Sequence, residues 1–214
     1  IKRAKKLILD AKRSGADIIK IQTYKADSLA INCNKTDFKL PKNSPWKKYK
    51  NLWALYDKAK TPYSWHKILF NYAKKIKIPI FSSPFDLEAF EFLEKLKCPF
   101  YKIASPEINH YPLIEKIART KKPTVISLGL AKDSEIKKIL KIFKKYKSNK
   151  LVLLHCVSNY PAENKEQNLK TINYLKRYNY PVGLSDHSIG IEAALTTVAL
   201  GGQMIEKHFN LNDT

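Results

Sequence analysis

Two histidines near the end of the sequence have the spacing and setting of a metal-ligand pair. His187 ends the segment Val182-Gly-Leu-Ser-Asp-His187, and His208 ends Ile205-Glu-Lys-His208. Both segments are short and apolar, as strands are, and neighbouring parallel strands would bring the two imidazoles together at one edge of a sheet. Two imidazoles with further positions open to water and substrate suit a catalytic divalent metal. A metal site is therefore favoured, and a general acid/base pair without metal is the alternative.

Two lysines lie inside apolar, strand-like segments, where a charge without an anionic partner is costly. Lys20 occurs in the segment 17–22, and Lys102 occurs in Tyr-Lys-Ile-Ala-Ser. Side chains two residues apart share one face of a strand, so Gln22 points the same way as Lys20. Packing alone could explain the presence of one lysine in an apolar strand, but it explains two such lysines less well. Together they predict a site for a phosphate or a carboxylate.

Serine hydroxyls recur at the ends of the strand-like segments. A serine after a strand is most often a helix cap or a turn residue, and this explanation is sufficient for any single one. It is less satisfactory for five different strand ends. Hydroxyls and lysines together would form a donor-rich cradle for a phosphorylated anion. The serines concerned are Ser83, Ser105, Ser127, Ser158 and Ser185.

Strand-like and helix-like segments alternate along the chain. The predicted strands are 17–22, 79–83, 100–105, 124–128, 151–156, 182–185 and 203–208. Helical apolar spacing and capping signals predict helices at 2–13, 87–96, 135–146 and 165–177.

This alternation predicts a parallel sheet with helices on its faces. Seven strands with a leading helix indicate an α/β fold of the (β/α)8 TIM barrel type that lacks its first strand and its last helix. A doubly wound open sheet is the competing architecture. However, no GxGxxG motif follows a strand, and polar residues recur at strand ends, as the rim of a barrel enzyme requires. At 214 residues the chain is slightly shorter than a typical barrel of about 250 residues.

One long irregular stretch, residues 24–60, interrupts the alternation. It contains Pro41, Pro45, Trp46 and Trp53. A loop of this length in a compact domain is usually functional, so we expect a lid or wall over the strand ends. A packed excursion, or an oligomer contact anchored by the tryptophans, is an equally good interpretation.

Composition excludes several classes of protein. A hydrophobic content of 44% argues against disorder, and no apolar run reaches the 18 residues of a membrane span. Cys33, Cys98 and Cys156 are scattered and form no CxxC pair, so a cytoplasmic protein is expected. The net charge of +21 raises nucleic-acid binding as an alternative, which would require a clustered basic face. Because the lysines are spread over helix-like stretches, we predict neither nucleic-acid nor membrane binding.

The segments described above resemble those of the sialic-acid synthase family. The resemblance runs in order from Ile1 to Thr214 and rests on Lys20-Ile-Gln-Thr-Tyr24, Phe81-Ser-Ser-Pro-Phe85, Tyr101-Lys-Ile-Ala-Ser105, Gly183-Leu-Ser-Asp-His187 and Ile205-Glu-Lys-His-Phe209. The pseudaminic acid synthase branch is resembled most, on the segments Leu52-Trp-Ala-Leu-Tyr56, Thr61-Pro-Tyr-Ser-Trp-His66 and Cys156-Val-Ser-Asn-Tyr-Pro161. N-acetylneuraminate and legionaminate synthases are the alternatives within the family.

The resemblance implies an enzyme that condenses phosphoenolpyruvate with an N-acetylated amino sugar, releases phosphate and forms a nine-carbon 2-keto sugar acid. It implies Mn²⁺ or Mg²⁺ as the cofactor, bound by His187 and His208, and Glu107 and Lys102 as catalytic residues. The positions implied for phosphoenolpyruvate are Lys20, Ser83, Lys102, Ser105, Ser127, Ser158 and Ser185, and those for the sugar are Gln22, Glu107 and Tyr160. Another phosphoenolpyruvate- or metal-dependent barrel aldolase is a more distant alternative.

Several family features are not found in this sequence. A first strand with a glutamate and an Asn-His pair is expected before Ile1, and an acidic segment is expected after Thr214. A C-terminal antifreeze-like domain, which serves the partner subunit in relatives, is also absent. Leu128 stands where many relatives have threonine. The expectation is a partial barrel catalytic domain over residues 1–214 of a longer, homodimeric parent.

Overall fold

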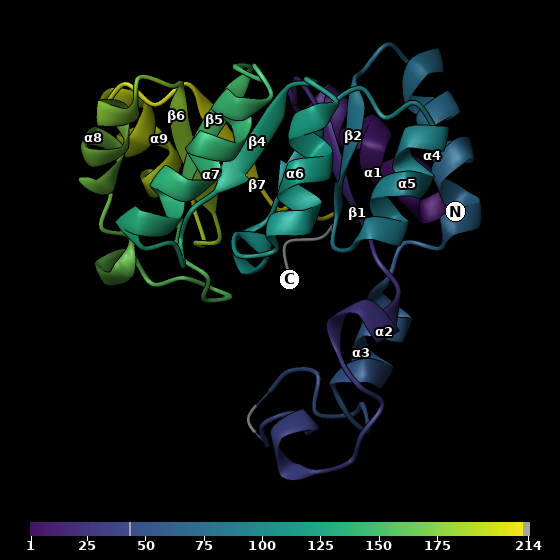
Figure 1. The fold of residues 1–214 in the computed structure, drawn as a ribbon. Helices are drawn as coiled ribbons and strands as arrows, with labels where there is room; N and C mark the ends of the chain where they lie inside the picture. The colour runs from purple at the N-terminus through teal and green to yellow at the C-terminus, as the bar shows by residue number, and fades with distance from the viewer. Residues whose placement is uncertain (43, 212–214) are drawn as a thin grey trace. The chain divides into compact units, whose positions relative to one another are not determined.

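The computed structural model describes residues 1–42 and 44–211. The chain forms two compact units, residues 1–98 and residues 99–214, and each is described by itself. The catalytic domain predicted over residues 1–214 includes residues 43 and 212–214, which lie outside the described ranges. Figure 1 shows the helices and strands with their labels.

The first unit contains two parallel strands with helices packed against them. Gln22 of β1 lies opposite Ser83 of β2. Apolar residues of α1, α4 and β2, among them Ile8, Leu69 and Ile80, form a buried cluster. The elements of this unit are α1 (Lys2–Arg13), β1 (Ile19–Thr23), α2 (Ala26–Leu29), η1 (Thr36–Phe38), α3 (Leu52–Ala59), α4 (Tyr63–Lys75), β2 (Ile80–Pro84) and α5 (Leu87–Lys95).

Residues 99–211 of the second unit form five strands, each parallel to the next along the chain. In Figure 1 its helices lie along the strands, and α8 and α9 pack against β6. The elements are β3 (Tyr101–Ile103), η2 (Ser105–Glu107), α6 (Tyr111–Arg119), β4 (Thr124–Ser127), α7 (Asp133–Lys145), β5 (Leu151–Cys156), η3 (Asn164–Glu166), α8 (Thr171–Leu175), η4 (Lys176–Tyr178), β6 (Val182–Asp186), α9 (Glu192–Ala199) and β7 (Met204–Lys207).

The predicted parallel α/β fold is confirmed, and each predicted strand overlaps an observed one. Asp86 caps α5 as expected, because its side chain accepts a hydrogen bond from the Ala89 amide at 2.6 Å. The predicted start of the helix at 135–146 is slightly wrong, since α7 begins at Asp133 after the N-cap Lys132.

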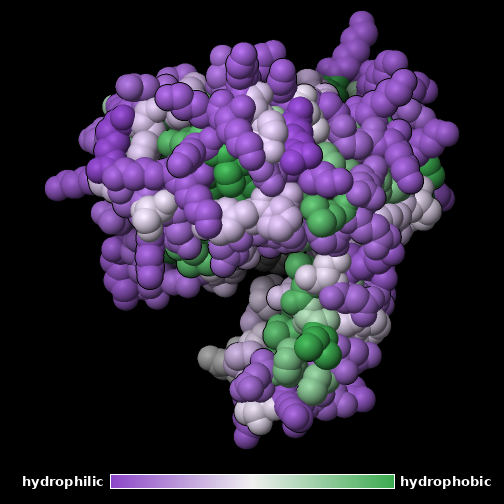
Figure 2. All heavy atoms as spheres, in the orientation of Figure 1, coloured by the Kyte–Doolittle hydropathy of each residue, from purple (hydrophilic) through white to green (hydrophobic). Residues whose placement is uncertain are grey.

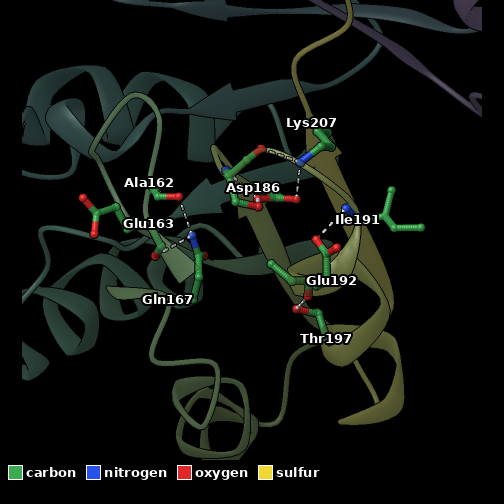
Figure 3. A network of polar contacts seen from close by, with 10 residues as sticks. Ala162, Glu163, Gln167, Asp186, Ile191, Glu192, Thr197 and Lys207 are labelled. Atoms are coloured by element: carbon green, nitrogen blue, oxygen red, sulfur yellow. Dashed lines mark hydrogen bonds and ion pairs between the residues drawn. The ribbon is translucent and has the colours of Figure 1, made fainter. Parts of the chain in front are cut away.

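The single helix predicted over residues 165–177 is wrong. Two 3-10 turns and the short helix α8 occupy this region, and Asn168 between them has a positive φ of 40°. The reason lies in Gln167, which is buried. Its side-chain amide contacts the carbonyls of Ala162 and Glu163 (Figure 3). Its own carbonyl oxygen lies 2.6 Å from His155 Nε2. These contacts to residues that precede Gln167 outweigh the local helical pattern.

A lysine in the left-handed backbone conformation follows each of four successive helices. Lys77, Lys97, Lys121 and Lys147 follow the C-caps of α4, α5, α6 and α7, with φ of 57°, 59°, 55° and 53°. Helices commonly end in this left-handed conformation, for which glycine is the usual residue. The turn from each of these helices to the next strand therefore uses lysine in a conformation that glycine adopts more easily.

The stretch 24–60 is not wholly irregular, because it contains α2, η1 and α3. Its side chains bond to one another. Asn51 Nδ2 donates to Asn32 Oδ1 and to the carbonyl of Cys33, both at 3.1 Å, and Trp53 Nε1 donates to Asp27 Oδ1 at 2.8 Å. The role of this stretch as a lid or wall stays a prediction.

The face of the chain in Figure 2 is mostly hydrophilic. Apolar side chains of the second unit pack between strands and helices, where Ile103, Ile126, Leu153 and Leu184 are fully buried. Burying each such side chain contributes about 1.5–3 kcal/mol. Within the described ranges, no helix has the length and apolar character that crossing a membrane requires.

Candidate active site at the strand ends

Strand register in the second unit places a row of polar side chains on one face of the sheet. Ser127 of β4 lies opposite Leu154 of β5, which lies opposite Gly183 of β6, so Ser127 and Gly183 share a face. Ser185, two residues further along β6, lies on that same face and opposite Glu206 of β7. The fold thus gathers polar groups that are far apart in the sequence.

Lys102 is the cation of this polar row and is almost completely buried, at 1% exposure. Its Nζ donates to Ser127 Oγ at 2.6 Å and lies 3.5 Å from Glu206 Oε1. Ser185 Oγ donates to the same Glu206 oxygen at 3.0 Å. A buried lysine needs an anionic partner, and here Glu206 provides it.

Glu206 is the functional candidate to which the sequence analysis gave no role. Its position two residues before His208 predicts that both share a strand face. The structure adds that Glu206 contacts Lys102 and Ser185. The available signal was strand parity. The contacts of Glu206 with Lys102 and Ser185 could not be inferred from strand parity, because they depend on the register between strands.

The two predicted metal ligands lie side by side. The ring centroids of His187 and His208 are 5.5 Å apart, with the ring planes inclined by 46°. His187 Nδ1 lies 2.7 Å from the carbonyl oxygen of Val157. Because a carbonyl only accepts, Nδ1 carries the proton in this contact, and Nε2 then carries the lone pair that a metal would bind. Metal-ligating histidines are usually oriented by such a second contact.

Tyr160 covers both imidazoles. Its ring is stacked on His187 with a centroid distance of 4.1 Å, and it meets His208 edge-on at 5.7 Å. Cys156 Sγ lies 3.9 Å from His187 Nδ1, and burial raises the pKa of this thiol, which keeps it uncharged. The thiol beside His187 is therefore neutral.

Glu107 follows β3 and is 8% exposed. Burial raises the pKa of its carboxyl group to about 7, although the charge of Lys102 opposes the rise. Among the described residues, Glu107 Oε2 has no hydrogen-bond partner. A carboxyl group with a pKa near neutrality is suited to proton transfer at physiological pH.

The remaining predicted residues of the second unit have local contacts. Ser105 Oγ accepts a hydrogen bond from the Leu130 amide at 3.0 Å, so it orients the segment after β4. Ser158 Oγ lies 4.0 Å from Cys156 Sγ. Ser105 therefore has a structural contact in addition to its predicted role.

Lys20, Gln22 and Ser83 lie in the first unit. Gln22 and Ser83 are opposite each other in the β1–β2 pair, and Lys20 is opposite Phe81. Ser83 is fully buried, whereas Lys20 and Gln22 are half-buried. Within this unit the register therefore brings two of the three predicted residues together.

The donor set fits a metal with open coordination positions. The described ranges contain no group of three or more His, Cys, Asp or Glu side chains arranged to hold a metal ion. His187 and His208 would supply two imidazole nitrogens, and water or substrate would supply the other ligands.

These features define a parallel α/β protein in which a buried cluster of lysine, serine and glutamate lies beside a histidine pair at the ends of the strands. The chain belongs to the NeuB family, whose model matches residues 7–214. It is 48% identical to the pseudaminic acid synthase of Campylobacter jejuni subsp. jejuni serotype O:2 over 213 residues, which are 99% of this chain and 62% of that protein.

Two further comparisons extend this result. The N,N'-diacetyllegionaminic acid synthase of the same organism is 38% identical over 98% of this chain and 63% of that protein. The crystal structure of N-acetylneuraminic acid synthetase from Leptospira borgpetersenii superposes with a TM-score of 0.84 at 34% identity, covering 98% of this chain and 68% of that one. The chain spans just over three fifths of the length of the two curated relatives.

Proposed function

We propose that this chain carries the catalytic site of a synthase that condenses phosphoenolpyruvate with an N-acetylated amino sugar. The products would be a nine-carbon 2-keto sugar acid and phosphate. One observation carries the proposal: a buried Lys102 bonded to Ser127 lies on the strand face that also carries Ser185 and Glu206, next to the His187–His208 pair. This arrangement provides a cation with hydroxyl groups for an anion, and imidazoles for a metal.

The anion part of the site would hold phosphoenolpyruvate. Lys102 has a desolvated ammonium group whose attraction for a phosphate oxygen is stronger than it would be in water. Its present partner Glu206 would share the cation with the incoming phosphate. The further residues proposed for this ligand are Lys20, Ser83, Ser105, Ser127, Ser158 and Ser185, and those proposed for the sugar are Gln22, Glu107 and Tyr160.

The histidine pair would hold Mn²⁺ or Mg²⁺. A bound divalent ion would polarise the sugar aldehyde as a Lewis acid. Val157 orients the His187 ring through its carbonyl oxygen, and Tyr160 packs on the same ring. The imidazole would therefore already have the orientation for binding before a metal ion arrives.

Glu107 would move the protons. Carbon 3 of phosphoenolpyruvate attacks the aldehyde carbon, and the aldehyde oxygen takes up a proton. Water adds to carbon 2 and loses one proton. Phosphate then leaves with its carbon–oxygen bond broken and takes the remaining proton of the new carbon 2 hydroxyl group as the 2-keto group forms. A carboxyl group with a pKa of about 7 can give the first proton and accept the second.

The proposal extends to the fold and the whole protein. We propose that the chain forms most of a (β/α)8 barrel and acts within a longer, homodimeric, cytoplasmic protein that binds neither nucleic acid nor membranes. Pseudaminic acid synthesis is favoured over legionaminic acid synthesis, because identity is higher to the synthase of the first product. N-acetylneuraminate synthesis and another barrel aldolase activity are the remaining alternatives.

Phosphate release tests the proposed function. The full-length protein is incubated with phosphoenolpyruvate, Mn²⁺ and a panel of sugars that includes a dideoxy diacetamido sugar and N-acetylmannosamine. Release that depends on the diacetamido sugar is expected, and release with N-acetylmannosamine alone would assign a different branch. Metal binding without phosphate release for any sugar would contradict the synthase function.

A further inference from the structure

A second polar network lies on the opposite side of the strands that carry the histidine pair. Asp186 of β6 and Lys207 of β7 are register partners, and their side chains point away from the face that holds Ser185 and Glu206. Figure 3 shows Lys207 reaching towards Asp186. The proposed reaction uses neither residue.

The contacts in this network satisfy both carboxylate oxygens of Asp186. Lys207 Nζ lies 2.5 Å from Asp186 Oδ2 and donates to the carbonyl of Ser188 at 2.8 Å. Asp186 Oδ1 accepts from the amide and the hydroxyl of Ser188, at 2.8 Å and 2.6 Å. The Asp186 side chain is completely buried, whereas that of Lys207 is 32% exposed. Removing one partner would leave a buried charge without compensation.

The position of the network along the chain connects it to the histidines. Asp186 immediately precedes His187, and Ser188 immediately follows it. Lys207 immediately precedes His208. A displacement of any member of the network would therefore move the backbone of a proposed metal ligand.

The spacing of β6 and β7 is independently restricted on the other face. A Cβ atom at Gly183 would lie 2.0 Å from the carbonyl oxygen of Met204, which belongs to the backbone of β7. The two strands thus approach each other as closely as glycine allows. A contact that fixes how β6 and β7 lie against each other in this region also fixes the positions of His187 and His208, which directly follow the two strands.

We propose that Asp186, Ser188 and Lys207 form a positioning network that sets the separation of His187 and His208, so that both imidazoles reach one metal ion. The inference rests on the proposed function for the metal pair. The network acts through the backbone, and none of its side chains contacts the metal or the substrate.

Mn²⁺ binding to the full-length protein, measured by electron paramagnetic resonance, tests the proposal. Lys207→Met removes the cation, and Asp186→Asn removes the charge while keeping an oxygen for Ser188. Each is expected to weaken Mn²⁺ binding about tenfold or more, as loss of an orienting partner typically does. Phosphate release should recover in both variants at saturating Mn²⁺, and Lys207→Arg should retain most of the affinity.

Lys145→Met is the matched control. Lys145 pairs with Glu115 at 3.1 Å on the surface helices α6 and α7, so this substitution removes the same charge without touching β6 or β7. Its Mn²⁺ affinity should equal that of the wild type. If Lys207→Met fails to fold, Asp186→Asn and Lys207→Arg provide the same comparison.

The outcomes separate this proposal from the proposed function. Wild-type Mn²⁺ affinity in Asp186→Asn and Lys207→Met, or a lost activity that excess Mn²⁺ does not restore, would contradict the positioning role. Mn²⁺ binding that does not depend on His187 would also overturn it. A wild-type protein that binds Mn²⁺ through His187, and is weakened by Lys207→Met, but releases no phosphate would contradict only the proposed function.

Discussion

Glu107 combines two opposing electrostatic effects in one side chain. Burial disfavours its ionised form and raises the pKa to about 7, whereas the charge of Lys102 favours ionisation. The raised pKa shows that burial is the larger effect. Glu107 is thus placed to exchange a proton near neutral pH, a property that the sequence alone could not reveal.

The raised pKa has a consequence for stability. Between about pH 4.5 and pH 7 the folded state binds the Glu107 proton more tightly than the unfolded state, so the free energy of unfolding falls as the pH rises through this range, by roughly 3 kcal/mol. Glu107→Gln removes this contribution. Urea unfolding at about pH 5 and pH 8 should show a smaller loss of stability in Glu107→Gln than in the wild type. An identical loss in both proteins would contradict the assigned pKa.

Other residues of the site differ in how far the sequence predicts them. Lys102 was identifiable because a lysine inside an apolar strand requires an explanation. Its contact with Ser127 followed from neither residue alone, because it depends on the register of β3 and β4. Glu206 had no such local signal, since a glutamate near the end of a strand is unremarkable in a sequence.

At the scale of elements, the alternation of apolar segments predicted the strands well and the helix ends less well. Strands are recognisable because burial on both faces requires continuous apolar residues. The helix predicted over residues 165–177 is wrong because Gln167 is held by contacts to residues before it, including His155 in β5. The apolar pattern within residues 165–177 cannot predict a contact with His155, which lies outside this range.

The lysines that end four helices give a prediction at this scale. Lys147 follows α7 with φ of 53°, a conformation that costs an L-residue about 1–2 kcal/mol. Lys147→Gly should therefore raise the free energy of unfolding by about 0.5–1 kcal/mol, after allowing for the entropy of glycine in the unfolded chain. Chemical denaturation measures the change.

Lys141→Gly is the control, because Lys141 lies on the exposed side within α7. The same substitution there should lower the free energy of unfolding by about 1 kcal/mol. Equal losses for both variants would show that the left-handed conformation of Lys147 carries no strain.

At the largest scale, the 214 residues together carry a net charge of +21. Such a charge attracts anions over a distance that salt shortens. Phosphoenolpyruvate is an anion, whereas an N-acetylated amino sugar is neutral. The same field can therefore favour one of the two proposed substrates and leave the other unaffected.

Steady-state kinetics of the full-length protein at different ionic strengths test this effect. Between about 0.05 M and 0.5 M salt, kcat/KM for phosphoenolpyruvate should fall several-fold, while KM for the sugar stays constant. Equal changes for both substrates would show that salt acts on the fold or the chemistry, and no change for phosphoenolpyruvate would exclude a role for the charge.

The proposed function depends most directly on His187 and His208 binding one metal ion. Mn²⁺ binding to the full-length protein, followed by electron paramagnetic resonance, should show one tight site in the wild type and in His110→Ala, because His110 is the N-cap of α6 and is not one of the proposed metal ligands. The site should be lost, or weakened at least a hundredfold, in His187→Ala and His208→Ala. Wild-type Mn²⁺ affinity in either of these two variants would contradict the account.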